Sequence, residues 1–165
     1  MVEYSSFATP IGRLQLLAVK NGVVKISFES ATSDEIKKWC QKYLSKSPVK
    51  GGKFSKIAKS QILDYLNGKR MNLTFPVVHF NSPFCKKVLE AERSIPYGET
   101  RSYREVAGMV KNPRAARAVG SGNAGNPLPL YFPCHRVIAT NGGLGGFGGG
   151  LKVKQFLLEL ESKPN

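Results

Sequence analysis

Residues Asn126–Arg136, NPLPLYFPCHR, decide how the second half of this chain folds. Two prolines among the first four residues exclude a helix, because proline lacks a backbone N–H and its ring clashes with the preceding turn. Leu128, Leu130 and Phe132 alternate with other residues, which predicts a short buried strand. The segment is therefore expected to hold Cys134, which follows that strand, in a defined position.

Cys134 lies between Pro133 and the pair His135-Arg136. Cationic neighbours favour the thiolate form of a cysteine, and the thiolate is the nucleophile. The segment thus predicts a reactive cysteine in a cationic neighbourhood. The alternative for an isolated Pro-Cys-His is an inert core thiol.

Seven of the nine residues from Gly142 to Gly150 are glycine. A phosphate-binding P-loop is excluded because the Gly-Lys-Ser/Thr ending is absent. A flexible linker is the alternative, but Leu144 and Phe147 interrupt the run and a helix follows it. We expect a tight wall of backbone whose N–H groups face a flat ligand.

The closing helix is amphipathic. Its apolar face carries Val153, Phe156, Leu157 and Leu160. Glu161 lies one turn beyond Leu157, at the edge of that face, where a carboxylate suits a histidine partner. Ordinary polarity at a helix end is the alternative.

A helix-turn-helix is predicted ahead of the cysteine. Ser102 can cap a short helix that ends at about Met109, and residues 110–112 form a turn. Pro113 then begins a second helix, which ends at about Gly120. Two short helices joined by a tight turn are common, so the pattern needs support from its residues.

Arg114 and Arg117 are three residues apart and would share one face of the second helix. The residues around them are small and would allow close approach to a DNA backbone: Ala115, Ala116, Ala118 and Gly120. A close helix–helix contact with two solvated arginines explains the same residues equally well.

The first half of the chain predicts a small α+β unit. Arg13–Val19 and Val23–Phe28 have the pattern of strands, and Asn21-Gly22 is a two-residue hairpin signal. Ser33 can cap one helix, and a second helix is predicted from Ser55 to Asn67.

The second half opens with Ser82-Pro83, which predicts a helix that ends before the turn at Ile95–Gly98. Cys40 and Cys85 are expected to be structural thiols, with a bridge between them as the less favoured alternative.

Charge adds a functional indication. Lys and Arg number 25 against 11 acidic residues, so the formal net charge is +14. No Asp or Glu occurs from Val106 to Leu158, a stretch with six cations: Lys111, Arg114, Arg117, Arg136, Lys152 and Lys154. Such a segment favours a nucleic-acid partner over a solubilising surface. The chain has no signal-peptide pattern or membrane span, so a cytoplasmic protein is expected, nucleoid-associated in a prokaryote.

Several motifs occur together in one order. They are Ile95–Thr100 (IPYGET), Ser102-Tyr103, Ala116–Gly120 (ARAVG), Asn126-Pro127, Pro133–Ile138 (PCHRVI), Leu144–Gly146 (LGG) and the closing Lys154, Leu157-Leu158 and Glu161. As a set they resemble the O6-alkylguanine-DNA alkyltransferase family over nearly all of residues 82–161. The first half resembles it more loosely, through Thr9–Gly12 (TPIG).

The resemblance implies a fold and a reaction. Residues 1–80 are expected to form a ribonuclease-H-like α/β domain, and residues 81–165 a mainly helical domain with a helix-turn-helix of winged-helix type. The chain as a whole would be α+β. The expected reaction is irreversible transfer of one alkyl group from O6-alkylguanine in duplex DNA to Cys134, with O4-alkylthymine left open as a second substrate.

The resemblance also implies residue roles. A relay of Cys134, a bridging water, His135 and Glu161 would remove the thiol proton. Asn126 would tie the DNA-binding helix to the active-site strand, and Tyr103 would donate to guanine N3. The remaining pocket residues would be Val137, Phe147 and Gly148.

For DNA, the resemblance implies minor-groove binding with base flipping, in which Arg117 fills the vacated stack. The other expected DNA contacts are Tyr103, Arg114, Ala116, Ala118, Gly120 and Arg136. The protein would act as a monomer, with cooperative assembly on DNA as the alternative.

The sequence departs from the family pattern at two pocket positions. Phe147 replaces a common tyrosine, and Gly148 replaces the serine of some members, which leaves only a backbone donor. Some members hold zinc in the first half, but only Cys40 and His79 are present here, so we expect no metal and no cofactor.

Two other classes remain. A lesion-sensing DNA binder without transfer chemistry would lack the reactive cysteine, so Cys134 argues against it. A cysteine hydrolase would need turnover and an oxyanion hole, and its histidine usually comes from a distant segment.

Overall fold

The computed structural model describes residues 1–28, 32–46 and 48–164. The chain divides into two compact units, an N-terminal unit of Met1–Phe80 and a C-terminal unit of Asn81–Asn165. Within the described residues, no helix is long and apolar enough to cross a membrane. The mixture of a small sheet and several helices confirms the predicted α+β class.

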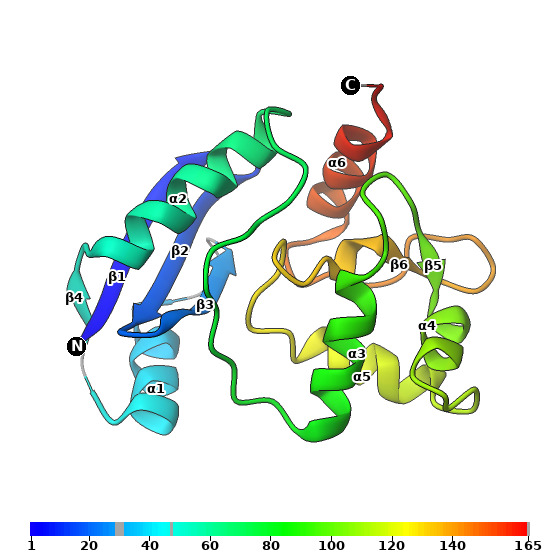
Figure 1. Cartoon of the computed structure of the whole chain (residues 1–165), viewed down its shortest axis with the longest axis horizontal. Coiled ribbons are helices and arrows are strands. Elements are labelled where there is room, and N and C mark those ends of the chain that lie inside the picture. The colour runs from blue at the N-terminus through cyan, green and yellow to red at the C-terminus, as the bar shows by residue number, and fades with distance from the viewer. Residues whose placement is uncertain (29–31, 47, 165) are drawn as a thin grey trace. The chain divides into compact units, whose positions relative to one another are not determined.

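The N-terminal unit is built on a four-stranded sheet with the order β3-β2-β1-β4 (Figure 1). Its strands are β1 (Val2–Thr9), β2 (Gly12–Val19), β3 (Gly22–Phe28) and β4 (Pro48–Lys50). The first three are antiparallel, and β4 pairs with β1 in parallel. The hairpin predicted at Asn21-Gly22 joins β2 to β3, whereas β1 and β4 were not predicted.

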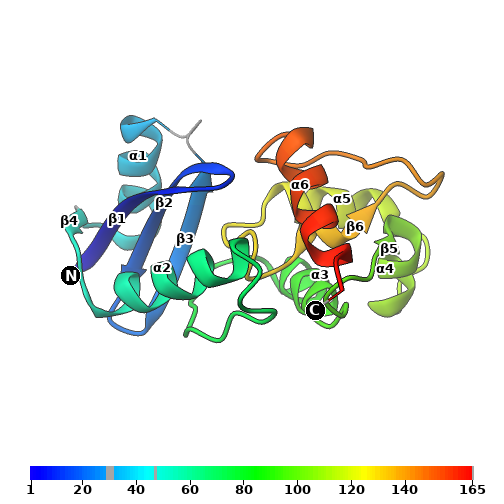
Figure 2. The same ribbon diagram turned by 90° about the horizontal axis from the view of Figure 1, so that it is seen from above.

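Two helices, α1 (Ser33–Leu44) and α2 (Lys53–Leu66), lie on opposite faces of this sheet (Figure 2). The cap of α1 is Thr32 and not Ser33 as predicted, because Thr32 forms a reciprocal capping box with Glu35. Cys40 is buried in the core beneath α1, as expected for a structural thiol. Cys40, Cys85 and Cys134 are all free, so the alternative of a bridge is not realised.

Over the described residues 81–164, the C-terminal unit contains four α-helices: α3 (Pro83–Arg93), α4 (Tyr103–Met109), α5 (Ala116–Ala124) and α6 (Leu151–Ser162). A single 3-10 turn, η1 (Cys134–Arg136), leads into β6 (Val137–Ile138), which pairs in parallel with β5 (Arg101–Ser102). The core between these elements is formed by Val88, Ile95, Val106, Ala107, Val119 and Val137.

The predicted caps of α3 and α4 are confirmed. Ser82 accepts a hydrogen bond from the Cys85 N–H, and Ser102 forms a capping box with Glu105. Each cap satisfies backbone donors that a helix start leaves unpaired.

The second helix of the helix-turn-helix differs from the prediction. α5 begins at Ala116 rather than Pro113, because the Ala115 N–H bonds to the Asn112 carbonyl and closes a turn first. Arg114 therefore lies outside the helix and does not share a helical face with Arg117. The helix also continues beyond Gly120 to Ala124.

The strand predicted over residues 128–132 does not form. Leu128, Leu130 and Phe132 are all buried, but Leu130 adopts a left-handed backbone with φ of 74°. The Phe132 N–H bonds to the Leu128 carbonyl, so this segment is a compact turn with only an isolated bridge. Burial was predicted correctly, and the extended conformation was wrong.

We expect Gly22→Ala to destabilise the N-terminal unit by about 2–3 kcal/mol, since φ is +147° and a Cβ would lie 2.5 Å from the Pro76 carbonyl oxygen. Gly51→Ala is the matched control, because Gly51 has a φ of +82° but no neighbour within 4 Å. Chemical denaturation should show a clearly smaller loss for the control, about 1 kcal/mol. Equal losses would mean that the contact with Pro76 contributes nothing.

Candidate active site

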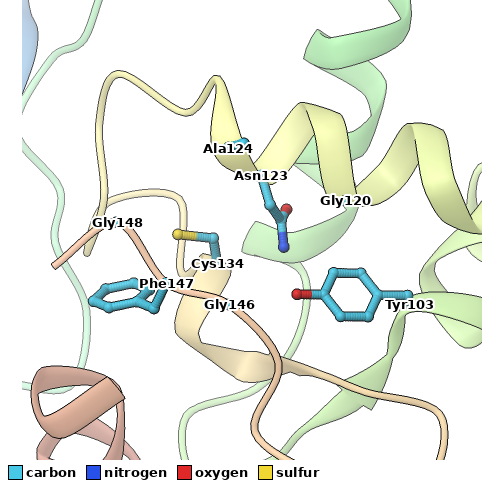
Figure 3. Close-up of a pocket in the computed structure, with 8 residues that line it drawn as sticks. All are labelled: Tyr103, Gly120, Asn123, Ala124, Cys134, Gly146, Phe147 and Gly148. Carbon is cyan, nitrogen blue, oxygen red and sulfur yellow. The ribbon is translucent and has the colours of Figure 1, made fainter. Parts of the chain in front are cut away.

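A pocket of about 330 Å³ opens in front of Cys134 in the C-terminal unit. Its walls come from α4, α5, η1 and the glycine-rich loop, and the lining residues are Tyr103, Gly120, Asn123, Ala124, Cys134, Gly146, Phe147 and Gly148. Figure 3 shows the Tyr103 hydroxyl and the Asn123 amide directed toward the space beside Cys134, with Phe147 on the other side. Of the glycine-rich run Gly142 to Gly150, which was predicted to form a wall of backbone, residues 146–148 line the pocket.

Local hydrogen bonds hold Cys134 in place. Its N–H bonds to the Phe132 carbonyl at 2.8 Å, and the Arg136 N–H closes the η1 turn on the Pro133 carbonyl at 2.9 Å. The Asn126 side chain donates to the same carbonyl at 3.0 Å and accepts from the Leu128 N–H at 2.9 Å. The Asn126 amide also lowers the pKa of the Cys134 thiol, so the residue just after α5 acts on the cysteine.

Behind the cysteine, Glu161 receives hydrogen bonds from two consecutive residues of η1. His135 Nε2 lies 2.9 Å from Glu161 Oε1, and Arg136 binds both carboxylate oxygens, through Nε at 2.9 Å and Nη2 at 2.8 Å. The third guanidinium nitrogen donates to the Ile95 carbonyl at 2.7 Å. Because all three side chains are buried, this is a buried ionic network.

The network determines the charges of its members. Burial alone disfavours the ionised form of Glu161, but hydrogen bonds from His135 and Arg136 outweigh it and lower its pKa to about 2. Burial lowers the pKa of His135, and the hydrogen bond to Glu161 opposes that effect. The resting site therefore contains a carboxylate, a guanidinium and a neutral imidazole able to accept a proton.

The expectation of a thiolate stabilised by cationic neighbours is corrected. Burial, followed by the charge of Glu92, raises the pKa of Cys134. Asn126 and the Lys154 charge lower it, but their effect is smaller, and the pKa of the thiol is about 12. The charge of Arg136 is directed at Glu161 instead. The cysteine is therefore a neutral thiol at rest, and its reaction requires a base.

The sequence analysis did not single out Asn123 or Glu92, and it named Lys154 only as one of the basic residues and as part of the closing motif. Asn123 lines the pocket from α5. Lys154 is fully buried in α6, and its ammonium donates to the Val137 carbonyl at 2.6 Å and to the Gly146 carbonyl at 3.2 Å. Glu92 is fully buried in α3, where its spacing from Val88 and Leu89 on the apolar face was the available signal.

The predicted DNA-binding residues fall into different positions. Arg117 and Ala118 are exposed on α5, Ala116 is half-buried, and Gly120 lies at the pocket. Arg114 is exposed in the turn before α5. These residues could contact a ligand from one edge of the pocket.

Two assignments need correction. Arg136 is only 7% exposed and serves Glu161, so it does not fit a DNA-contacting role. Val137 belongs to the hydrophobic core and does not line the pocket. Within the described part of the chain, no three His, Cys, Asp or Glu residues are grouped to hold a metal ion.

Two domain models of one protein family match this chain. The ribonuclease-like domain of 6-O-methylguanine DNA methyltransferase matches residues 2–78, and the DNA-binding domain of the same family matches residues 83–163. Together they span nearly the whole sequence.

Named relatives agree with these matches. A methylated-DNA–protein-cysteine methyltransferase of Methanosarcina acetivorans is 37% identical over 158 residues, which cover 96% of this chain and 97% of the relative. The constitutive enzyme of that name from Bacillus subtilis is 35% identical over 162 residues, or 98% and 96% of the two chains. The crystal structure of Mycobacterium tuberculosis OGT in complex with DNA superposes with a TM-score of 0.84 at 36% identity, and the match covers 97% of this chain and 92% of that one.

The buried network predicts an acid transition. Since the pKa of Glu161 is lower in the folded protein than its ordinary value of 4.5, its stabilisation is complete above pH 4.5 and is lost as pH falls through about 2. Glu161→Gln should cost about 3–5 kcal/mol near neutral pH, because it leaves Arg136 buried without a counter-charge. Denaturant titrations at several pH values measure both effects.

Glu159→Gln is the matched control, because Glu159 is an exposed carboxylate on the same helix. It should unfold like the wild type at every pH. A Glu161→Gln variant with unchanged stability and an unchanged acid limb would contradict the role assigned to the network.

Proposed function

The chain belongs to the 6-O-methylguanine DNA methyltransferase family, and on this premise we propose that Cys134 accepts the alkyl group from O6-alkylguanine in duplex DNA. The protein is a methylated-DNA–[protein]-cysteine S-methyltransferase that acts in DNA repair and binds DNA. The observation that carries the assignment to Cys134 is its position at the base of the pocket, in front of the His135–Glu161 pair.

The reaction begins with removal of the thiol proton. His135 follows Cys134 directly, so a bridging water carries the proton from Sγ to the imidazole, and Glu161 stabilises the imidazolium that forms. A base is needed because the buried thiol is otherwise neutral. The pair supplies it only when the substrate is in place and the thiol begins to react.

The thiolate then attacks the saturated carbon attached to O6. The carbon–O6 bond breaks, its electron pair goes to the guanine, and a carbon–sulfur bond forms on Cys134. The Tyr103 hydroxyl, at the wall of the pocket, stabilises the charge that develops on the base by donating to N3. A backbone N–H near Gly148 serves the O6 position, and the proton lost by the thiol ends on the guanine.

The product explains a single turnover. A thioether is chemically stable, and no residue of the pocket is suited to remove the alkyl group from sulfur. Each molecule therefore repairs one lesion. O4-alkylthymine carries the same alkyl–oxygen group and is a second candidate substrate.

Access to O6 requires that the damaged base leave the duplex. Unstacking and unpairing cost a few kcal/mol, and an exposed side chain beside the pocket can offset this cost by filling the gap. Arg117 is exposed on α5, two turns or fewer from the pocket residues Gly120 and Asn123. We assign Arg117 this role and propose that the protein acts as a monomer. Arg114, Ala116 and Ala118 would lie along the DNA. Recognition of the lesion would depend little on the surrounding DNA sequence.

We expect intact-protein mass spectrometry to show a gain of one methyl group after mixing with duplex DNA that carries one O6-methylguanine. Peptide mapping should place the methyl group on Cys134, and the mass gain should stop at one methyl group per protein molecule. Cys134→Ala should gain no mass yet still bind the DNA, whereas Cys85→Ala, at another free thiol of this unit, should react normally. Tight lesion binding without transfer by the wild type would leave a damage-sensing DNA binder, and repeated ester cleavage would indicate a hydrolase.

Arg117→Ala should slow single-turnover methyl transfer from duplex DNA about ten- to a hundredfold, the equivalent of losing about 1.4–3 kcal/mol of support for the flipped base. Transfer from free O6-methylguanine base should be unchanged, because no stack has to be opened. Arg13→Ala removes an equal charge from the exposed surface of the N-terminal unit and serves as the control. Equal slowing on both substrates would rule out the flipping role.

A further inference from the structure

Glu92 is a buried acid that the proposed reaction does not use. Its side chain, on the last turn of α3, is 0% exposed. Neither carboxyl oxygen has a hydrogen-bond partner among the described residues. An unpaired buried polar group is costly and uncommon, so its presence beside an active site calls for an explanation.

Four titratable groups on four elements lie within reach of the charge of Glu92. They are Cys134 of η1, Lys154 of α6, Tyr103 of α4 and Cys85 of α3 itself. The charge of Glu92 acts on the pKa of each one. α3, which carries Glu92, also packs against η1, which carries Cys134.

Glu92 and Lys154 act on Cys134 in opposite directions. The ammonium of Lys154, held by the Val137 and Gly146 carbonyls, favours a negative charge on sulfur. A negative charge on Glu92 disfavours it. While the Glu92 carboxyl is neutral, the Lys154 ammonium stabilises the Cys134 thiolate without opposition. Once the carboxyl is ionised, its negative charge offsets that stabilisation.

We propose that Glu92 is a positioning residue that acts through Cys134, permitting thiolate formation while its carboxyl is neutral and opposing it once the carboxyl ionises. The inference rests on the proposed function, since it takes Cys134 as the alkyl acceptor. Glu92 contacts neither DNA nor base in this scheme. It sets the electrostatic surroundings in which His135 removes the thiol proton.

The direction of the pH dependence follows from the environment of the carboxyl. Burial raises the pKa of Glu92 to about 8, and the Lys154 ammonium only partly opposes the shift. Glu92 is therefore mostly neutral near pH 7 and ionises between about pH 7 and 9. Between about pH 7 and 9, the rate constant of methyl transfer should therefore rise less with pH in the wild type than in a variant without the Glu92 carboxyl.

The test compares wild type, Glu92→Gln and Glu90→Gln in single-turnover transfer from O6-methylguanine duplex DNA between pH 6.5 and 9.5. The ratio of the Glu92→Gln rate constant to the wild-type one should be constant below pH 7. It should then rise up to about tenfold at pH 9, the effect of one unit in the pKa of Cys134. Glu90 is exposed two residues away on α3, so Glu90→Gln should follow the wild type.

A merely structural effect of the substitution would change the rate equally at every pH. Parallel profiles for Glu92→Gln and the wild type would therefore overturn the proposal. Absence of methyl transfer in the wild type would instead refute the proposed function, so the two failures are distinguishable.

A second measurement needs no variant and no DNA. Carbon-13 NMR of the wild type should show one glutamate carboxyl that titrates near pH 8. The rate of Cys134 alkylation by iodoacetamide, measured by peptide mapping, should rise less steeply with pH while Glu92 ionises, between about pH 7 and 9, than it does below pH 7. A Glu92 carboxyl that titrates below pH 6 would overturn the proposal even if Glu92→Gln did not fold.

Discussion

The carboxylate of Glu161 is the group on which the rest of the active site depends. It brings α6 to η1 through His135 and Arg136, and Arg136 extends the connection to the Ile95 carbonyl at the end of the α3 region. These contacts involve the two residues that follow Cys134 in η1, so one buried anion fixes the surroundings of the proposed nucleophile and of its histidine. Stability and chemistry are thus coupled, because a change that frees the carboxylate disturbs both.

Burial is the second constraint, and it acts on the nucleophile itself. A thiol that is 7% exposed and has a pKa of about 12 is a poor general nucleophile, which protects it from reaction with other electrophiles. In the proposed reaction, reactivity then depends on a substrate in the pocket that Cys134, Tyr103 and Gly146–Gly148 line. Under the proposed single turnover this restraint is useful, since any unintended alkylation of Cys134 would end the activity of the molecule.

Much of this arrangement is predictable from local sequence signals. The caps Ser82 and Ser102, the hairpin at Asn21-Gly22 and the place of Glu161 on the closing helix follow from helix and turn chemistry that acts within a few residues. The first strand was missed, because Val2–Thr9 alternates weakly between buried and exposed positions. Two wrong predictions, the strand around Leu130 and the start of α5, arose because local backbone hydrogen bonds close turns there. Distant contacts explain the burial of Arg136 and Val137, and the burial of Glu92 was not predicted. Arg136 illustrates the reason, since its partner Glu161 is 25 residues away and a basic side chain beside a cysteine predicts an exposed cation.

Glu161 and Glu92 show how hydrogen bonds decide the state of a buried acid. Both are almost fully buried in the same unit, so desolvation opposes ionisation of each. Glu161 accepts hydrogen bonds from a guanidinium and an imidazole, and its pKa falls to about 2. Glu92 has no such donors among the described residues and only the Lys154 charge nearby, and its pKa rises to about 8. Both acids act on Cys134. Glu161 holds His135, the proposed base, and the charge of Glu92 raises the pKa of the Cys134 thiol. A reactive cysteine in a closed pocket is therefore controlled less by the number of cations near it in sequence than by which of its buried neighbours are hydrogen-bonded.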